Sequence, residues 1–409
     1  MDHVPDFLPA LHLVTAHART VMPPAKEQRP LLSAHGRILA QAILADRDQP
    51  PFDRSTRDGF ALQAGSLADR TVVGLLRAGD RWTGPPLAPD QAIEIMTGAP
   101  VPPGANAVLM IEHAIRSADN HLTFAPDRIP VSGQNIVGQG AELRAGQAAL
   151  TLGTRLDASE IAVAASLGAH QVSVFRKLRV AILATGDELV DLEQTPEPHQ
   201  IRNSNSYMLA ALVAETGGEP VRLPIVRDRT DDLTNALAEA RTCDLILFSG
   251  GVSMGKYDLV EPILASANAT FFFTGVRMQP GKPVVFGALP PSGVHPHTFF
   301  FGLPGNPIST QVTFLCFVAP LLHALAGQAD FGPLFAQATL SEAILARPGL
   351  TRLLPASLTS SVAKPVVRLI PWQGSGDLAA NARANCYALL PADHPSDFTP
   401  GETVSLLLR

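Results

Sequence analysis

The sequence predicts an α/β multidomain protein built around a doubly wound α/β domain, and three observations lead to this fold class. A chain of 409 residues with 46% apolar and 17% charged residues is too long for one hydrophobic core, so about three or four domains are expected. From residue 179, apolar strand patterns alternate with helical periodicity. Beyond residue 327 helical periodicity is lost, and short strands between Gly and Pro turns predict a small C-terminal β-barrel or sandwich.

The doubly wound domain is predicted from elements that alternate along the chain. The predicted strands cover residues 180–184, 221–225, 245–248, 270–273, 284–289 and 298–301. The predicted helices cover residues 204–216, 231–241 and 259–265, and a long helix begins at residue 308. Gly217 and Gly218 end the first helix. The last helix is apolar, but Gln311, Pro320 and His323 interrupt it, so we interpret it as a buried helix rather than a membrane span.

The regions on either side of this domain follow other patterns. Residues 47–150 are rich in Pro, Gly and short apolar runs such as 107–111, which predicts a β-rich module. Helices are expected at 7–18 and 158–167, and the second begins after a capping signal, Asp157 or Ser159. In the last part of the chain, strands are expected at 366–370, 388–390 and 404–408.

Net charge limits the classes of macromolecule that the protein is expected to bind, and cysteine content indicates its cellular compartment. The net charge of −6 gives no overall attraction to nucleic acid or anionic lipid, and no basic run is interleaved with aromatic residues. We therefore expect neither a nucleic-acid partner nor a membrane. Cys243, Cys316 and Cys386 are odd in number and widely spaced, which is typical of reduced buried thiols and favours a cytoplasmic location. The N-terminus lacks a basic n-region, so a signal peptide is not expected.

Glycine-rich loops adjoin three apolar runs of the doubly wound domain. The most informative is LILFSGGVSMGKYD at 245–258, and the other two lie at 279–283 and 303–307. Glycines in the first loop let backbone N–H groups approach phosphate oxygens without a Cβ in the way. These glycines are Gly250, Gly251 and Gly255. Because such loops gather at the carboxyl ends of parallel strands, the sequence predicts a site for an anionic ligand, with ordinary turns as the alternative for each single loop.

Carboxylates are expected at the same edge of the sheet. Asp187 and Glu188 follow the first strand, Asp228 follows the second, and Asp258 ends the glycine-rich loop. Four acids beside a phosphate-binding loop repel one another unless a hard divalent cation bridges them, and Mg²⁺ is the simplest candidate. For each acid alone, a helix cap or a solvated loop charge is the alternative. No histidine cluster, Cys-His pair or G-x-S-x-G elbow competes as a catalytic site.

Eight segments together resemble the MoeA family, the molybdopterin molybdenumtransferases, to which the C-terminal part of gephyrin also belongs. They occur in the family's order from about residue 46 to the end of the chain. The segments are PFDRSTRDGFAL at 51–62, TGAPVPPGANAVLMIE at 97–112, ATGDEL at 184–189, SNSYML at 204–209, SGGVSMGKYD at 249–258, MQPGKP at 278–283, FGLPGNP at 301–307 and GSGDLAANARAN at 374–385.

The resemblance implies a homodimer of four-domain subunits with its active site at the subunit interface. Family members take adenylylated molybdopterin, insert molybdenum from molybdate and release AMP with the help of Mg²⁺. A molybdopterin adenylyltransferase is therefore the implied substrate donor. The implied domains are a MogA-like molybdopterin-binding α/β domain from 1–19 with 177–328, a helical linker domain from 20–46 with 140–176, a β-rich inserted domain from 47–139 and a C-terminal β-barrel domain from 329–409.

The resemblance also implies the site residues. Asp58 and Thr97 would reach from the β-rich domain of one subunit into the pocket of the other. Glu188 and Asp258 correspond to carboxylates that handle metal and substrate, and Lys282 corresponds to an anion-binding lysine. These five are the implied catalytic residues, and Glu188 and Asp258 are the implied metal ligands. The implied substrate-binding residues are Gly250, Gly251, Ser253, Gly255, Asp228, Pro280, Gly281, Pro304, Gly305 and Pro307.

The chain departs from the family pattern at several positions. Val137 and Gly138 stand where basic residues are expected, and Arg57 stands where a methionine is frequent. Arg202 and Asn203 replace an aromatic-Asp pair, which removes a carboxylate.

Two functions other than molybdenum insertion stay open. The glycine-rich loop type also occurs in MogA-like adenylyltransferases, and the loss of basic residues is compatible with a non-catalytic molybdopterin-binding carrier or scaffold.

Overall fold

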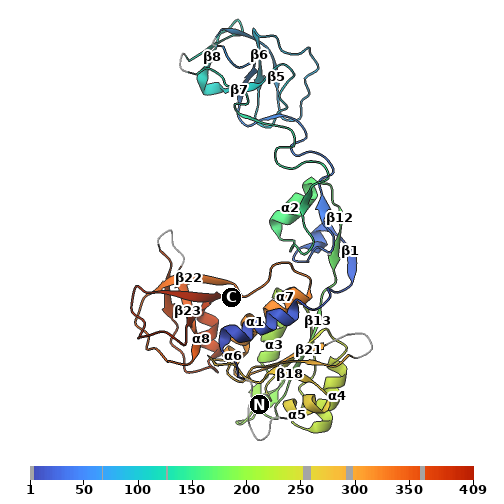
Figure 1. Cartoon of the computed structure of the whole chain (residues 1–409), viewed down its shortest axis with the longest axis vertical. Helices are drawn as coiled ribbons and strands as arrows, with labels where there is room; N and C mark the ends of the chain where they lie inside the picture. The colour runs from blue at the N-terminus through green and yellow to red at the C-terminus, as the bar shows by residue number, and fades with distance from the viewer. Residues whose placement is uncertain (1–3, 67, 126–127, 252–258, 292–297, 360–363) are drawn as a thin grey trace.

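The computed structural model describes residues 4–66, 68–125, 128–251, 259–291, 298–359 and 364–409. The chain is elongated (Figure 1). A β-rich module lies at one end, and the α/β sheet and the C-terminal barrel lie together at the other. A slender region joins the two ends and contains α2 (Ala158–Ser166), β1 (Lys26–Pro30) and β12 (Gln171–Phe175).

The α/β region is built on a six-stranded sheet in the order β16-β13-β17-β21-β20-β18. The strands are β13 (Arg179–Ala184), β16 (Glu219–Arg222), β17 (Leu245–Ser249), β18 (Thr270–Phe273), β20 (Val285–Leu289) and β21 (Thr298–Leu303). The first four strands of this order are parallel, whereas β20 runs antiparallel to both β21 and β18. The sheet is therefore mixed. β16 begins two residues before the predicted strand, because the Glu219 amide already bonds to the Leu178 carbonyl at 2.8 Å.

Helices cover both faces of this sheet, which confirms the predicted doubly wound fold. Successive side chains of a strand point to opposite faces. Val180 and Leu245 pack in one buried cluster with α1, α3, α6 and α7, and Ala181 and Ile246 pack in another with α4 and α5. The helices are α1 (Phe7–Ala18), α3 (Asn205–Glu215), α4 (Thr230–Ala240), α5 (Val260–Ser266), α6 (Pro307–Thr313) and α7 (Ala319–Leu325).

A π-helical turn at Phe314–Val318 joins α6 and α7 into one helix, Pro307–Leu325. With 19 residues this helix is long and apolar enough to cross a membrane, yet 78% of its most apolar window is buried inside the protein. Its side chains contribute to the main hydrophobic cluster of the α/β region. The interpretation of this segment as a buried core helix is thus confirmed.

The C-terminal region is a closed barrel of five strands, as predicted. The strands are β22 (Phe335–Leu340), β23 (Thr351–Thr359), β24 (Val366–Leu369), β25 (Cys386–Leu390) and β26 (Thr403–Leu408). They pair in the order β23-β24-β22-β26-β25, and β25 pairs back to β23. A two-residue strand from the α/β region, β19 (Met278–Gln279), also pairs with β23. The sequence did not predict α8 (Leu378–Arg383), which lies between β24 and β25.

The β-rich module and the slender region consist of short elements. The module is a six-stranded sheet in the order β7-β4-β6-β5-β9-β8. Its strands are β4 (Gly59–Leu62), β5 (Arg70–Leu76), β6 (Gln91–Ile95), β7 (Ala107–Met110), β8 (Ala114–Arg116) and β9 (His121–Phe124). The slender region combines α2 with two small sheets, β1 with β12 and β2 (Ile43–Leu44) with β11 (Ala148–Leu150). Asp157 caps α2, and its amide donates to Glu160 at 3.1 Å.

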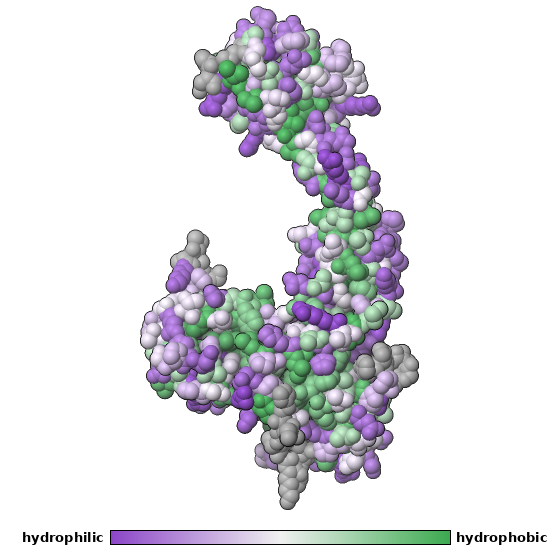
Figure 2. Space-filling model, in the orientation of Figure 1, coloured by the Kyte–Doolittle hydropathy of each residue, from purple (hydrophilic) through white to green (hydrophobic). Residues whose placement is uncertain are grey.

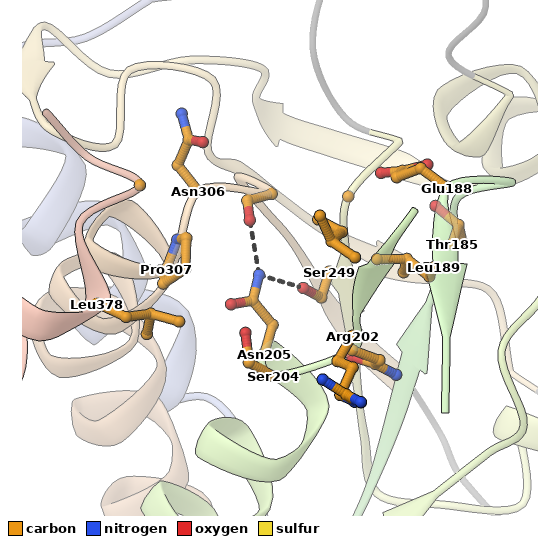
Figure 3. Close-up of a pocket in the computed structure, with 15 residues that line it drawn as sticks. Thr185, Glu188, Leu189, Arg202, Ser204, Asn205, Ser249, Asn306, Pro307 and Leu378 are labelled. Atoms are coloured by element: carbon orange, nitrogen blue, oxygen red, sulfur yellow. Dashed lines mark hydrogen bonds between the residues drawn. The ribbon is translucent and has the colours of Figure 1, made fainter. Parts of the chain in front are cut away.

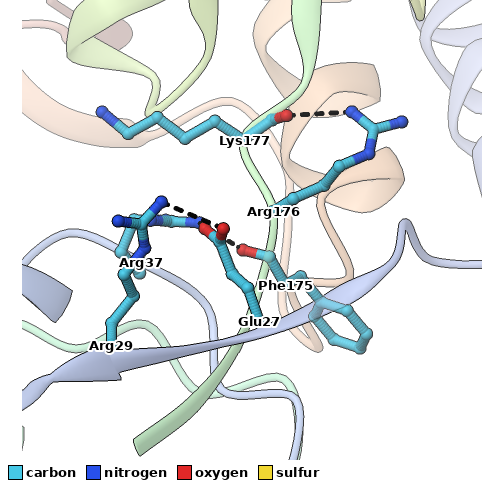
Figure 4. A network of polar contacts seen from close by, with 6 residues as sticks. All are labelled: Glu27, Arg29, Arg37, Phe175, Arg176 and Lys177. Atoms are coloured by element: carbon cyan, nitrogen blue, oxygen red, sulfur yellow. Dashed lines mark hydrogen bonds and ion pairs between the residues drawn. The ribbon is translucent and has the colours of Figure 1, made fainter.

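Paired charges stabilise the slender region and join it to the α/β sheet at the edge opposite the glycine-rich loops. Arg37 is 7% exposed and donates to the Glu27 carboxylate and, at 2.6 Å, to the Phe175 carbonyl (Figure 4). Arg176 forms two hydrogen bonds with the Asp244 carboxylate, at 2.8 and 2.6 Å. Because both arginines have carboxylate partners, we interpret this cluster as a structural connection.

The stability of the chain is expected to fall as the pH is lowered from about 6.5 to about 4. Burial, helped by the positive charge of Arg155, lowers the pKa of His323 from 6.5 to about 4. In this window the unfolded chain binds the proton more strongly, so stability that is complete above pH 6.5 is lost toward pH 4. The loss is on the order of 3 kcal/mol. Chemical unfolding at pH 7 and pH 4 measures it, and His323→Gln should flatten the dependence. An equal dependence in wild type and variant would contradict this assignment.

Candidate functional site

A pocket of about 450 Å³ lies at the edge of the α/β sheet where β13, β17 and β21 end (Figure 3). In this view Glu188 and Arg202 lie on one side of the pocket, and Asn306, Pro307 and Leu378 lie on the other. Leu378 is the first residue of α8, so the C-terminal region contributes one wall. The predicted position of a ligand site at this edge therefore coincides with a cavity.

The loop after β17 packs closely against the loop after β13, and glycine is required for this packing. Gly250 and Gly251 have φ angles of 91° and 65°, which L side chains rarely adopt. A Cβ at Gly250 would lie 2.8 Å from the Thr185 carbonyl oxygen, and one at Gly251 would lie 2.7 Å from Thr185 Oγ1. The two loops thus form one continuous floor at the sheet edge.

Asn205, the first residue of α3, connects the last residue of β17 to the loop after β21. Its Nδ2 donates to Ser249 Oγ at 3.1 Å and to the Gly305 carbonyl at 2.7 Å (Figure 3). Thr310 in α6 donates in turn to the Pro304 carbonyl at 2.6 Å. The loops that line the pocket are therefore cross-linked through helices on the same side of the sheet.

Two charged side chains, Glu188 and Arg202, line the described part of the pocket. Glu188 folds back over Gly186, which has a φ of 146° and where a Cβ would lie 2.4 Å from Glu188 Oε2. Thr185 is 3% exposed, and its Oγ1 has no hydrogen-bond partner in the described structure. A carboxylate and an unpaired hydroxyl thus lie along one wall, and both are hard oxygen donors of the kind that Mg²⁺ prefers.

The pocket brings together some of the predicted site residues. Glu188, Gly250, Gly305 and Pro307 line it. Pro304 is buried beneath it. Asp228 lies two residues after Val226, whose carbonyl accepts from the Gly186 amide, but it does not line the pocket. Ser253, Gly255 and Asp258 lie outside the described residues.

The loop that contains Pro280, Gly281 and Lys282 lies at the same sheet edge, although it precedes a strand instead of following one. The sequence did not indicate this arrangement. It precedes β20, and β20 is antiparallel to β21 with Val285 opposite Gly302. The start of β20 therefore lies beside the end of β21. A Cβ at Gly281 would lie 2.6 Å from Thr313 in α6, so the loop packs against this helix. Lys282 is exposed, and this loop does not line the pocket itself.

Asp58 and Thr97 lie in the β-rich module, at the far end of the chain from the pocket (Figure 1). Asp58 Oδ1 accepts hydrogen bonds from the Thr97 amide at 2.6 Å and from Thr97 Oγ1 at 2.8 Å. These bonds, the amide bond first, lower the pKa of the Asp58 carboxyl below 3.8. Thr97 therefore holds the Asp58 carboxylate in place, and both residues are exposed.

The sequence reasoning missed several residues of the pocket. The SNSYML and GSGDLAANARAN segments carried the family resemblance, but no residue in them was selected as part of the site. The missed lining residues include Thr185, Arg202, Asn205, Ser249, Asn306 and Leu378. In the sequence, Arg202 stood out only as part of the Arg202-Asn203 pair, which replaces an aromatic-Asp pair of the family and so lacks its carboxylate.

Gly251→Ala is expected to destabilise the chain by about 2 kcal/mol, since the new Cβ must adopt a left-handed backbone conformation and would also lie too close to Thr185. Chemical unfolding measures this effect. Gly349→Ala is the matched control, because Gly349 also has a positive φ, of 79°, but nothing lies within 4 Å of a Cβ there. Equal stability of the two variants would show that the two loops are not packed as described.

The fold and the site define an α/β ligand-binding protein whose pocket lies at the carboxyl ends of parallel strands. Three family models match the chain: "MoeA N-terminal region (domain I and II)" at 8–168, "Probable molybdopterin binding domain" at 181–324 and "MoeA C-terminal region (domain IV)" at 337–408. The chain belongs to the MoeA family.

Individual relatives agree with this assignment. The chain is 30% identical to a molybdopterin molybdenumtransferase of Haemophilus influenzae over 391 residues, 94% of each chain. It is 39% identical to one of Nostoc sp. over 310 residues, 73% of this chain and 69% of the relative. Its structure is similar to that of the molybdopterin biosynthesis moeA protein from Pyrococcus horikoshii OT3, with a TM-score of 0.79, 28% identity and 100% of both chains covered.

Proposed function

We propose that this chain is a molybdopterin molybdenumtransferase of molybdenum cofactor biosynthesis. It takes adenylylated molybdopterin, inserts molybdenum from molybdate and releases AMP in a reaction that requires Mg²⁺. The observation that carries the proposal is family membership over nearly the whole chain, with relatives of that name at 30% and 39% identity. A molybdopterin adenylyltransferase supplies the substrate, and the reaction takes place in the cytoplasm.

The pocket supports binding of the substrate's phosphate groups. An anion can approach the backbone of the loop at Gly250 and Gly251 closely, because neither residue has a Cβ. The Gly250 amide itself donates to the Leu303 carbonyl at 3.2 Å, so the Gly251 amide is the proposed donor. Lys282, exposed at the same sheet edge, supplies positive charge to the reaction. Positioning and electrostatic stabilisation are the main contributions of proteins to phosphoryl chemistry, and this arrangement supplies both.

Mg²⁺ is the proposed metal, and Glu188 would hold it. Mg²⁺ takes one or two protein carboxylates and completes its shell with waters and substrate phosphates. The described residues contain no group of three or more His, Cys, Asp or Glu side chains, and such a group is not needed for this mode of binding. Glu188 and the unpaired Thr185 hydroxyl fit it, with Asp258 as the second proposed carboxylate. When bound, the ion offsets negative charge on the phosphates as AMP leaves.

A homodimer is proposed because Asp58 and Thr97 lie far from the pocket of their own chain. In a dimer the β-rich module of one subunit can reach the pocket of the other. Apolar side chains are exposed along the slender region, which Figure 2 shows in green. They include Met22, Leu32, Leu44 and Leu152, which are 84%, 82%, 54% and 54% exposed. Exposed apolar residues of this kind favour a protein interface.

The proposal is tested by AMP release from adenylylated molybdopterin, with Mg²⁺ and molybdate each present or withheld. Release that needs both ions is expected. Equal release without molybdate would contradict the proposal. Formation of adenylylated molybdopterin from molybdopterin and ATP would instead identify an adenylyltransferase. Stoichiometric pterin binding without turnover would identify a non-catalytic carrier. This alternative is suggested by Val137, which stands where the family has a basic residue.

A further inference from the structure

The pocket contains a cation that neither the glycine-rich loop nor the predicted lysine provides. Arg202 is the one Lys or Arg side chain among the described residues that line it. It belongs to β15 (Ile201–Arg202), which pairs in parallel with β14 (Leu189–Val190). This small ribbon follows the loop of Glu188, so the arginine and the carboxylate share one wall (Figure 3).

The hydrogen bonds of Arg202 leave most of its guanidinium available. Its Nε donates to the Leu192 carbonyl at 3.1 Å, which fixes the inner part of the side chain. Neither Nη1 nor Nη2 has a hydrogen-bond or ion-pair partner within the described ranges, and the residue is exposed. The Nη groups of an arginine form a planar pair of donors that matches two oxygens of an oxyanion.

The residue beside Arg202 has a different role. Asn203 is 3% exposed, and its Oδ1 accepts a hydrogen bond from the Ser206 amide at 3.2 Å in the first turn of α3. It supports the helix start without adding negative charge to the pocket. The lining charges of Glu188 and Arg202 therefore cancel, whereas Glu188 without Arg202 would repel an entering anion.

We propose that Arg202 binds the tetrahedral oxyanion that enters this pocket and is a specificity-determining residue of the reaction. This inference rests on the proposed function. Two sources share the required chemistry, the phosphate group of the nucleotide and molybdate. With one Mg²⁺ held at Glu188, the charges of Mg²⁺, Glu188 and Arg202 sum to about +2, which a dianionic oxyanion neutralises.

Calorimetric binding to the full-length protein tests the proposal, because it does not depend on turnover. AMP with Mg²⁺ and molybdate alone are titrated separately into wild type, Arg202→Gln, Arg202→Lys and Arg229→Gln. Arg229 is exposed, does not line the pocket and gives the same change of charge. Loss of a charge-assisted pair is expected to weaken binding about 10- to 100-fold in Arg202→Gln. Arg202→Lys should retain part of the affinity, and Arg229→Gln all of it.

The pattern of loss identifies the oxyanion. Weaker AMP binding with unchanged molybdate binding assigns Arg202 to the phosphate group, and the reverse assigns it to molybdate. Wild-type affinity of Arg202→Gln for both ligands overturns the proposal even if the enzyme is fully active, and so does an absence of binding to wild type. Arg202-dependent AMP binding in a protein that releases no AMP would support this site while removing the proposed function.

Discussion

Glu188→Gln is expected to lower Mg²⁺-dependent AMP release by about 100-fold or more. Glu188 is the one carboxylate among the described residues that line the pocket. The substitution keeps the shape of the side chain but removes the charge that would hold the cation beside the phosphates, and a metal contributes several kcal/mol to charge stabilisation in such reactions. Initial rates of AMP release over a range of Mg²⁺ concentrations measure the effect, and excess Mg²⁺ should restore part of the rate.

Asp191→Asn is the matched control for this variant. Asp191 lies three residues further along the chain, just after β14, is exposed and does not line the pocket, so the same loss of charge should leave the rate close to that of wild type. Equal losses in both variants would indicate that the overall charge of this edge matters rather than a ligand at Glu188. An unchanged rate in Glu188→Gln would rule out Glu188 as a metal ligand.

A mixed dimer of Asp58→Ala and Glu188→Gln subunits is expected to recover about half of the wild-type activity, although each homodimer is nearly inactive. If the β-rich module of one subunit completes the pocket of the other, one of the two sites in the mixed dimer contains both intact residues. Subunits with two different affinity tags can be co-expressed and the mixed dimer purified. AMP release per dimer then gives the recovered fraction.

A second mixed dimer, of Asp58→Ala and Thr97→Ala subunits, provides the control. Asp58 and Thr97 are hydrogen-bonded to each other and lie in the same module, so each site receives one damaged residue and no activity should return. Failure of the first mixed dimer to recover activity would show that Asp58 and Glu188 do not act together across an interface.

Much of the fold could be predicted because local patterns and tertiary packing agree. The residues of α1 match the predicted range, since its apolar periodicity coincides with the face that becomes buried. Those of β18 also match, because a short apolar run there packs on both faces of the sheet. β23 was missed because Pro355 lies within it, and proline normally argues against a strand in a sheet. α8 was missed because six residues are too few for a helical period to be recognised.

The candidate site could be predicted only in part. The glycines at 250 and 251 were identifiable because their chemistry is local: positive φ and close backbone approach require glycine. Asn205 and Leu378 reach the pocket through tertiary packing, from the first turn of α3 and from α8 after the barrel strand β24. No local sequence pattern predicts that these two residues come together at one pocket. Arg202 differs again, because its importance depends on a cavity that only the folded chain defines.

The central claim, that this chain inserts molybdenum into the pterin, is tested most directly by the metal content of the product. Wild-type protein is incubated with adenylylated molybdopterin, Mg²⁺ and molybdate, and the released pterin and AMP are quantified by mass spectrometry. The account predicts about one molybdenum atom in the pterin for each AMP released. Release of AMP with a pterin that carries no molybdenum would contradict it.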